Sequence, residues 1–184
     1  EEFMLMEQQV SWFAAHGARA VVIGMLTSDG ALDRDGMARL IEAARTQNPD
    51  CKITLHRAFD VCRDPFAALE TAKELGVNTI LTSGQAASCV QGAPLLTELV
   101  HRAGDDLEIL IGAGVNAAVI GDLLPVTGAH AFHMSGKRTL DSQMIYRREG
   151  VPMGLPGISE FEIWRTDAQA IAQTRQVLDT YFAD

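Results

Sequence analysis

The chain has 184 residues, of which 47% are hydrophobic and 21% charged, and its formal net charge is -9. This length fits one domain, and the composition is that of an ordinary globular protein. The negative charge argues against a nucleic-acid or anionic-membrane partner, because both need a basic patch on the protein. No apolar run approaches the roughly 18 residues of a membrane span.

The cysteines and the first residues indicate the compartment. The start, Glu1-Glu2-Phe3, lacks the basic-then-apolar layout of a signal peptide. The three cysteines, Cys51, Cys62 and Cys89, form no C-x-x-C pair and are too scattered for a disulfide framework. We therefore expect a reducing, cytoplasmic location.

Helices and strands are predicted to alternate along the whole chain. Apolar residues at helical spacing before Gly17 indicate a first helix. Asp33 could cap the second helix, and Asp64-Pro65 suits the cap and first position of the third. The predicted order is helix 1–16, strand 20–26, helix 33–45, strand 52–56, helix 64–76, strand 78–82, helix 93–103, strand 107–111, helix 116–124 and strand 129–133. An irregular Gly- and Pro-rich stretch at 151–157 and a helix over 166–182 follow.

This alternation predicts an α/β fold with a parallel sheet, formed by one domain that covers residues 1–184. Five strands fit an open doubly wound sheet, and they also fit the last five strands of a TIM-type (β/α) barrel of about 250 residues. The barrel is favoured because the chain opens in a helix that leads into a strand. In addition, polar residues follow nearly every strand instead of gathering at one switch point.

The carboxyl ends of parallel strands form one edge, called the rim below, where ligands bind. Acid–base chemistry is the first hypothesis there: His56 and His133 could move protons, and Arg57 could hold a carboxylate or phosphate. Asp60 could orient His56 or Arg57, and Ser83 and Gln85 add hydrogen-bonding groups on the same rim. The alternative is structural, with Arg57 and Asp60 as a buried ion pair that holds the loop.

An anion site is the second hypothesis for the rim. Gly112 and Gly114 follow a strand and precede a helix, so that backbone N–H groups and the helix N-terminus could face an anion. Ser135 and Lys137, after the next strand, offer a hydroxyl and a cation. The alternative is a tight turn that merely needs glycine.

A copper site is the third hypothesis, because Cu(I) prefers thiolate and thioether ligands. Cys62 and Met134 could converge across a barrel mouth, although the cysteines and methionines form no C-x-x-C or M-x-x-M motif. The bland alternative is that these side chains belong to the core.

Four short segments of the sequence resemble the CutC family of copper homeostasis proteins. They follow the order and spacing of the family, and the resemblance covers nearly the whole chain. They are Leu55-His56-Arg57-Ala58-Phe59-Asp60, Leu81-Thr82-Ser83-Gly84-Gln85, Gly112-Ala113-Gly114-Val115 and Met144-Ile145-Tyr146-Arg147.

The resemblance implies a TIM-type barrel, a cytoplasmic location, copper binding and self-association as a homodimer or higher homo-oligomer. It also implies that about the first three barrel strands, with the cysteines usually discussed as copper ligands, are missing from this chain. The family register places Gly112–Gly114 after strand seven and Ser135 after strand eight, where barrels often bind phosphate.

Three functions follow as expectations. The first is a cytoplasmic copper homeostasis protein that binds copper. The second is an enzyme that acts on a small anionic or phosphorylated metabolite by His/Asp acid–base chemistry. The third is a degenerate barrel that serves only as an assembly surface.

Overall fold

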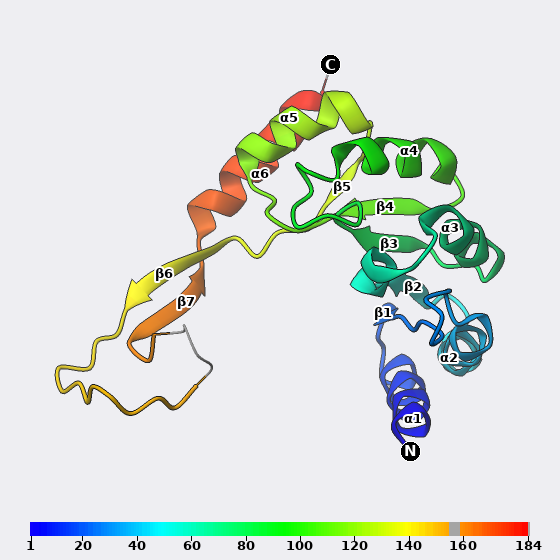
Figure 1. Cartoon of the computed structure of the whole chain (residues 1–184), viewed down its shortest axis with the longest axis horizontal. Helices are drawn as coiled ribbons and strands as arrows, with labels where there is room; N and C mark the ends of the chain where they lie inside the picture. Colours follow the sequence, from blue (N-terminus) through cyan, green and yellow to red (C-terminus); the bar gives the residue numbers. More distant parts are fainter. Residues whose placement is uncertain (155–158, 184) are drawn as a thin grey trace.

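The computed structural model describes residues 1–154 and 159–183. Five parallel strands form one sheet whose spatial order is the chain order (Figure 1). They are β1 (Ala20–Ile23), β2 (Lys52–Leu55), β3 (Thr79–Thr82), β4 (Glu108–Ile111) and β5 (Ala131–Phe132). Within the described residues β1 and β5 do not pair with each other, so the sheet is open and has two edges. This agrees with the prediction of a (β/α) barrel that is incomplete.

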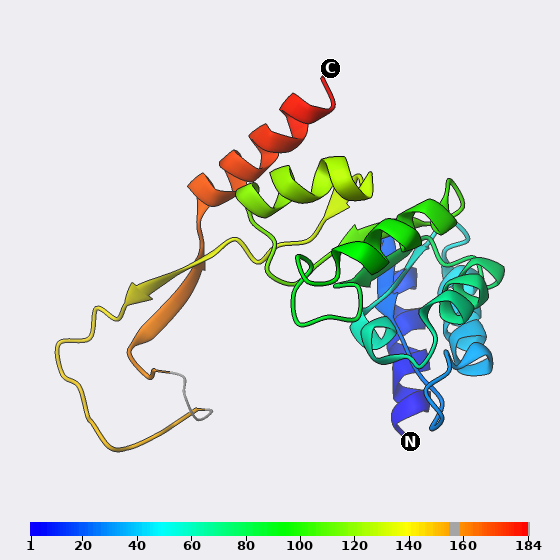
Figure 2. The same ribbon diagram turned by 45° about the horizontal axis from the view of Figure 1, so that its top comes forward.

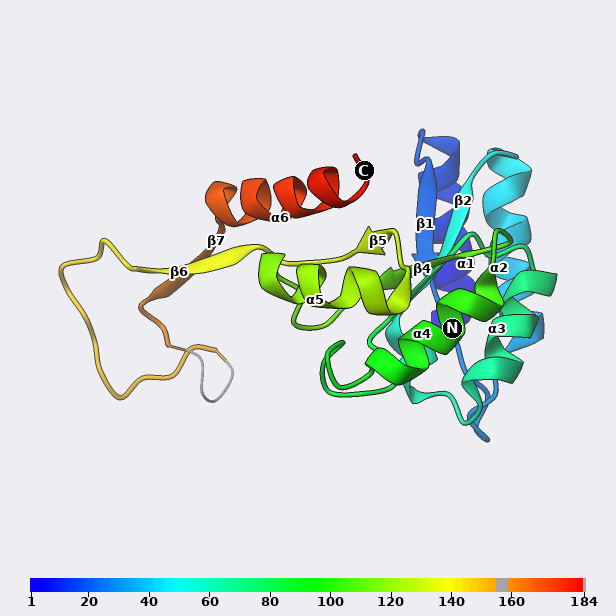
Figure 3. The same cartoon turned by 90° about the horizontal axis from the view of Figure 1, so that it is seen from above.

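The described residues also form six α-helices and one 3-10 turn. They are α1 (Glu2–Ala15), α2 (Arg34–Gln47), η1 (Arg57–Val61), α3 (Pro65–Glu74), α4 (Ala93–Ala103), α5 (Ala117–Thr127) and α6 (Ala168–Tyr181). Helix α1 precedes the first strand, and α6 follows the last. Helices α2, α3 and α4 lie on one face of the sheet, and α1 packs against α2 (Figure 3). At the other end of the sheet α6 packs on α5.

The two faces of the sheet differ in burial because side chains alternate along each strand. On the helix-covered face, residues such as Ile53, Ile80 and Ile111 are fully buried and form the core with the helices. On the opposite face Val22 is 61% exposed, and Leu81 is only half-buried. The core therefore lies between the sheet and the helices, and the second face is left uncovered.

Short polar side chains set the starts of the helices. The carboxylate of Asp33 accepts a bond from the backbone N–H of Gly36, and that of Asp64 accepts two from the first turn of α3. Such caps satisfy N–H groups that have no partner inside the helix. Both caps were predicted from the sequence.

A two-stranded antiparallel hairpin, which the sequence analysis did not predict, follows β5. Its strands are β6 (Lys137–Asp141) and β7 (Glu162–Thr166), and it projects from the body of the molecule (Figure 2). Residues 137–154 and 159–166 are called the arm below. Of the irregular stretch expected at 151–157, residues 151–154 carry no helix or strand, and residues 155–157 lie outside the described residues.

The remaining differences from the predicted elements are local. Strands β1 and β5 are shorter than expected, η1 was not predicted, and α5 continues through Pro125 to Thr127. None of the described helices is long and apolar enough to cross a membrane.

The difference between the two faces predicts the effect of truncating neighbouring side chains of β3. Ile80→Ala should lower the free energy of unfolding by about 2–5 kcal/mol, because it removes fully buried methyl groups and leaves a cavity. Leu81→Ala, on the uncovered face, should cost less than half as much. Urea unfolding of both variants measures this difference, and equal losses would contradict a one-sided core.

Candidate functional site

The residues singled out in the sequence lie along the rim. His56 follows β2 directly, Ser83 follows β3, Gly112 follows β4 and His133 follows β5. Backbone bonds continue the ladder into this edge, since Gly112 N–H donates to Thr82 and His133 N–H donates to Ile111. The parallel sheet thus brings together residues that are far apart in sequence.

Asp60 is the best-connected side chain of the rim. It lies in η1, and its side chain is only 6% exposed. The backbone N–H of Ser83 donates to both carboxylate oxygens at 3.0 and 3.1 Å, and the N–H of Gln85 donates to Oδ1 at 3.3 Å. The hydroxyl of Thr82 donates to Oδ1 as well. The carboxylate of Asp60 therefore ties the turn after β2 to the loop after β3.

These donors control the charge of Asp60. Burial alone would raise the pKa of this carboxyl group, because it disfavours the charged form. Hydrogen bonds from Thr82, Arg57 and Ser83 outweigh burial, and the pKa of Asp60 lies below its ordinary value of 3.8. Asp60 is therefore an anion at neutral pH.

Arg57 is held in place by this carboxylate. Its Nε donates to Asp60 Oδ2 at 2.6 Å, and its Nη2 donates to Ser83 Oγ at 2.9 Å. The side chain is nevertheless 47% exposed. Part of the guanidinium is thus fixed by the protein, and the rest faces solvent, where it could hold a carboxylate or phosphate.

His56 turns away from this network toward β1. The backbone N–H of Ala58 donates to His56 Nδ1 at 3.1 Å, so that the neutral ring carries its proton on Nε2. A Cβ on Gly24 would lie 2.7 Å from two atoms of the ring, so the ring packs closely on the backbone there. His56 lines a groove of about 370 Å³ together with α1 and β1. His56 and Arg57 are adjacent in sequence, but their side chains therefore face different sides of the rim.

The predicted anion loop adopts the backbone that glycine allows. Gly114 and its neighbour Ala113 have positive φ values of 83° and 73°. Gly112 lies between Leu81 and His133, since a Cβ there would approach Leu81 to 2.8 Å and the Cβ of His133 to 3.9 Å. The structure thus places His133 beside Gly112, at the β3–β5 end of the rim.

The residues predicted after the last strand belong in part to the arm. Lys137 begins β6, and its ammonium lies 3.7 Å from the centre of the Trp164 ring. The backbone carbonyl of Gly136 accepts a bond from Asp167 N–H at the start of α6, and Met134 lies near Gly136. Ser135 is exposed. Lys137 is therefore engaged with the hairpin.

Cys62 is one of two free thiols at the rim; the other, Cys89, lies in the loop after β3, where its backbone N–H donates to the carbonyl oxygen of Ala113. Gln85 Nε2 lies 2.8 Å from the carbonyl oxygen of Cys62 and 3.3 Å from its Sγ. Burial raises the pKa of this thiol and outweighs the hydrogen bond from the backbone of Asp64, which lowers it. No group of three His, Cys, Asp or Glu side chains in residues 1–154 and 159–183 is arranged to hold a metal ion.

Sequence reasoning missed the role of Thr82 and named Gln85 only as a polar group of the rim. Both contact η1, because the hydroxyl of Thr82 donates to Asp60 and Gln85 Nε2 donates to the carbonyl oxygen of Phe59. Gln85 has a φ of 55°, which is rare for a residue other than glycine. A signal was available: Thr82 is a polar residue at an inward position of a buried strand, where it needs a partner.

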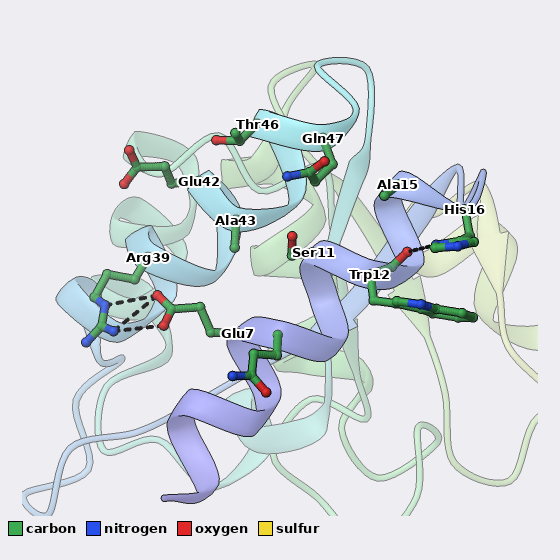
Figure 4. A pocket seen from close by; sticks show the side chains of 11 residues that line it. Glu7, Ser11, Trp12, Ala15, His16, Arg39, Glu42, Ala43, Thr46 and Gln47 are labelled. Carbon is green, nitrogen blue, oxygen red and sulfur yellow. Dashed lines mark hydrogen bonds and ion pairs between the residues drawn. The ribbon is translucent and has the colours of Figure 1, made fainter.

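A surface groove of about 690 Å³ lies elsewhere, between α1 and α2 (Figure 4). Arg39 and Glu7 form an ion pair at one end with a shortest distance of 3.0 Å, and Trp12 stacks on His16 at the other. None of the predicted site residues lines this groove.

Parallel βα units with polar residues at one rim define a (β/α)-barrel-type α/β protein. The comparison with known proteins specifies it further: the model of the CutC family matches residues 1–138. A CutC family protein of Parabacteroides distasonis is 49% identical over 82% of this chain, and one of Vibrio vulnificus is 41% identical over 95%. The chain belongs to the CutC family.

A solved structure supports the fold. The crystal structure of a candidate copper homeostasis protein CutC from Streptococcus agalactiae has a TM-score of 0.66 and is 26% identical; the match covers 72% of this chain and 63% of that protein. The chain spans 61% of the length of the Parabacteroides relative and 69% of the Vibrio relative.

The network predicts a pH-dependent contribution of Asp60 to stability. Asp60→Asn replaces one acceptor oxygen by a donor that faces N–H groups, and should lower the free energy of unfolding at pH 7 by about 2 kcal/mol. Because the folded-state pKa lies below the ordinary value of 3.8, the advantage of wild type should persist above that pH and vanish as the pH falls through the folded-state pKa.

Urea unfolding at several pH values measures this difference. Asp106→Asn is a suitable control, because that carboxylate is 75% exposed. A wild-type advantage that stays constant down to low pH would show that the charge of Asp60 does not matter.

Proposed function

We propose that this chain acts in copper homeostasis in the cytoplasm and binds copper ions. Membership of the CutC family carries the proposal, and the Streptococcus agalactiae structure described as a copper homeostasis protein supports it. The scattered cysteines add support for a reducing compartment.

The chemistry of copper directs attention to Cys62. Cu(I) binds soft thiolate and thioether groups. Cys62 is a free thiol at the rim, whereas the free thiol of Cys51 precedes β2 at the opposite end of that strand. The described residues bring no cluster of ligands to Cys62, so they fit a copper site at one ligand only. Met134, predicted as a second ligand, lies near Gly136 and Ile171.

Replacement of Cys62 tests copper binding. Cys62→Ser should lower the copper bound per chain by about one ion, whereas Cys51→Ser, which removes another buried thiol, should leave it unchanged. Burial raises the pKa of the Cys62 thiol, and copper must displace its proton. The copper affinity of wild type should therefore rise about tenfold per pH unit between pH 6 and 8.

Competition with a Cu(I) chelator at each pH measures both the stoichiometry and the affinity. Equal copper content in wild type and Cys62→Ser would remove Cys62 from the site.

A second candidate function is an enzyme that acts on a small anionic or phosphorylated metabolite. The observation that favours it is Arg57, which is oriented by Asp60 and Ser83 and is still half exposed. His133, which lies beside Gly112, would move the proton; His56, predicted for the same role, faces the groove beside β1. Gly112, Gly114 and Ser135 would complete the anion site.

Inorganic phosphate is the probe for this second function. Arg57→Gln should raise the dissociation constant for phosphate at least tenfold, since a charged donor is lost. Arg102→Gln is the matched control, because Arg102 is 46% exposed and also paired with a carboxylate, but lies in the last turn of α4. Calorimetric titration measures the constants, and equal affinities in wild type and Arg57→Gln would contradict an anion site at Arg57.

A further inference from the structure

The arm belongs to the connection that leaves the rim at the end of β5. This connection runs from residue 133 to 167, whereas the connections after β3 and β4 span only 83–92 and 112–116. In α/β proteins the loops at the carboxyl ends of the strands build the binding site, and an unusually long connection is typical of a lid. The place of the arm in the chain therefore relates it to the ligand site of the rim.

The two ends of the arm meet at a narrow base. The carbonyl oxygen of Gly136 accepts a hydrogen bond from the backbone N–H of Asp167 at 2.7 Å, and Lys137 pairs with Thr166 next to it. Gly136 has a φ of 51°, in the left-handed region that favours glycine. The arm projects from the side of the sheet at which β3 and β4 end (Figure 1). A change at this base would thus turn the arm as one piece relative to the rim.

The arm carries large apolar side chains that its own fold leaves in solvent. Ile145 is 100% exposed, and six further residues are 39% exposed or more: Met144, Tyr146, Val151, Met153, Ile163 and Trp164. Strands β6 and β7 contact chiefly each other, and a two-stranded hairpin alone is marginally stable in water. At the rim, Leu81 is only half-buried on the uncovered face of the sheet, beside Gly112. A closed arm would bury these apolar groups together.

The charge of the arm fits an anion held between the arm and the rim. The arm carries five Lys and Arg residues against four Asp and Glu, whereas the whole chain carries 15 against 24. Arg147 is paired with Asp141, but Arg148 is exposed and takes part in no ion pair within residues 1–154 and 159–183. Without a ligand the exposed guanidinium of Arg57 repels such a cation, and a bound anion attracts it. Anion binding therefore favours the closed arm over the open one.

We infer that the arm is a lid that closes over the rim of its own chain when an anion binds at Arg57. Closure places apolar side chains of the arm near Leu81 and excludes water from Arg57 and His133. The short tether to β5 keeps the lid at a high effective concentration at the rim. The inference rests on the second candidate function and narrows its ligand: a closing lid selects a small, detached anion over an anionic group on a macromolecule.

The two tryptophans of the chain make this motion measurable. Trp12→Phe leaves Trp164 in β7 as the only indole, and Trp12 itself lies at the α1–α2 groove, away from the rim. Saturating inorganic phosphate should shift the fluorescence emission of Trp164 to shorter wavelength and slow backbone amide hydrogen exchange in β6 and β7. Both effects should be lost in Arg57→Gln, because the anion no longer binds.

Replacement of Ile145 tests the apolar contact. Since Ile145 is fully exposed in the open arm, Ile145→Ser should leave the circular dichroism spectrum unaltered. It should raise the dissociation constant for phosphate about tenfold, because closure no longer buries an isoleucine side chain. Val126→Ser is the matched control, at a 58% exposed position of α5, and should bind phosphate as wild type does.

The outcomes separate the lid from the anion site. Phosphate that binds wild type by calorimetry without changing Trp164 emission or exchange in the arm would overturn the lid and leave the anion site standing. Absence of phosphate binding would overturn both. An Ile145→Ser variant with wild-type affinity would overturn the lid, and so would an emission shift that follows protein concentration instead of phosphate, since the contact would then lie between two copies.

Discussion

The carboxylate of Asp60 is the anchor of the rim. Backbone N–H groups of Ser83 and Gln85 surround it much as they would surround a bound anion, and the hydroxyl of Thr82 and the guanidinium of Arg57 add further donors. The carboxylate of Asp60 therefore occupies an anion-binding arrangement of N–H groups that a bound ligand could otherwise occupy. The contact fixes η1 against the loop after β3, and thereby sets the positions of Arg57 and Cys62.

This anchor explains why neighbouring residues of the rim face different surroundings. Arg57 follows Asp60 toward β3, whereas His56 packs on Gly24 and faces the groove beside β1. The thiol of Cys62 lies under Gln85. The Arg57 side suits an anion, and the Cys62 side suits a soft metal. The two candidate functions thus draw on different parts of one rim.

Sequence patterns predicted the parts of the fold that depend on local signals. The order of βα units follows from alternating periodicity, and the start of α3 follows from Asp64-Pro65. The sequence did not predict the arm, because strands β6 and β7 are mostly polar on both faces and pair with each other instead of packing on a core. The ends of the predicted strands identified the residues of the rim, but they could not identify the hydrogen-bond partners of these residues. The separation of His56 from Arg57 depends on Gly24, which no spacing rule connects to His56.

The order of the sheet has a consequence for how the chain assembles. Within the five-stranded sheet, strands that pair are neighbours in sequence, so each new βα unit adds to an existing edge. Each pairing reaches only to the adjacent βα unit, as in the pairing of Ala20 with Lys52. Such pairings make the sheet resemble a linear array in which loss of an end unit leaves the inner pairings intact. Units could therefore be added beyond β1 or β5 without altering the register of the strands between them.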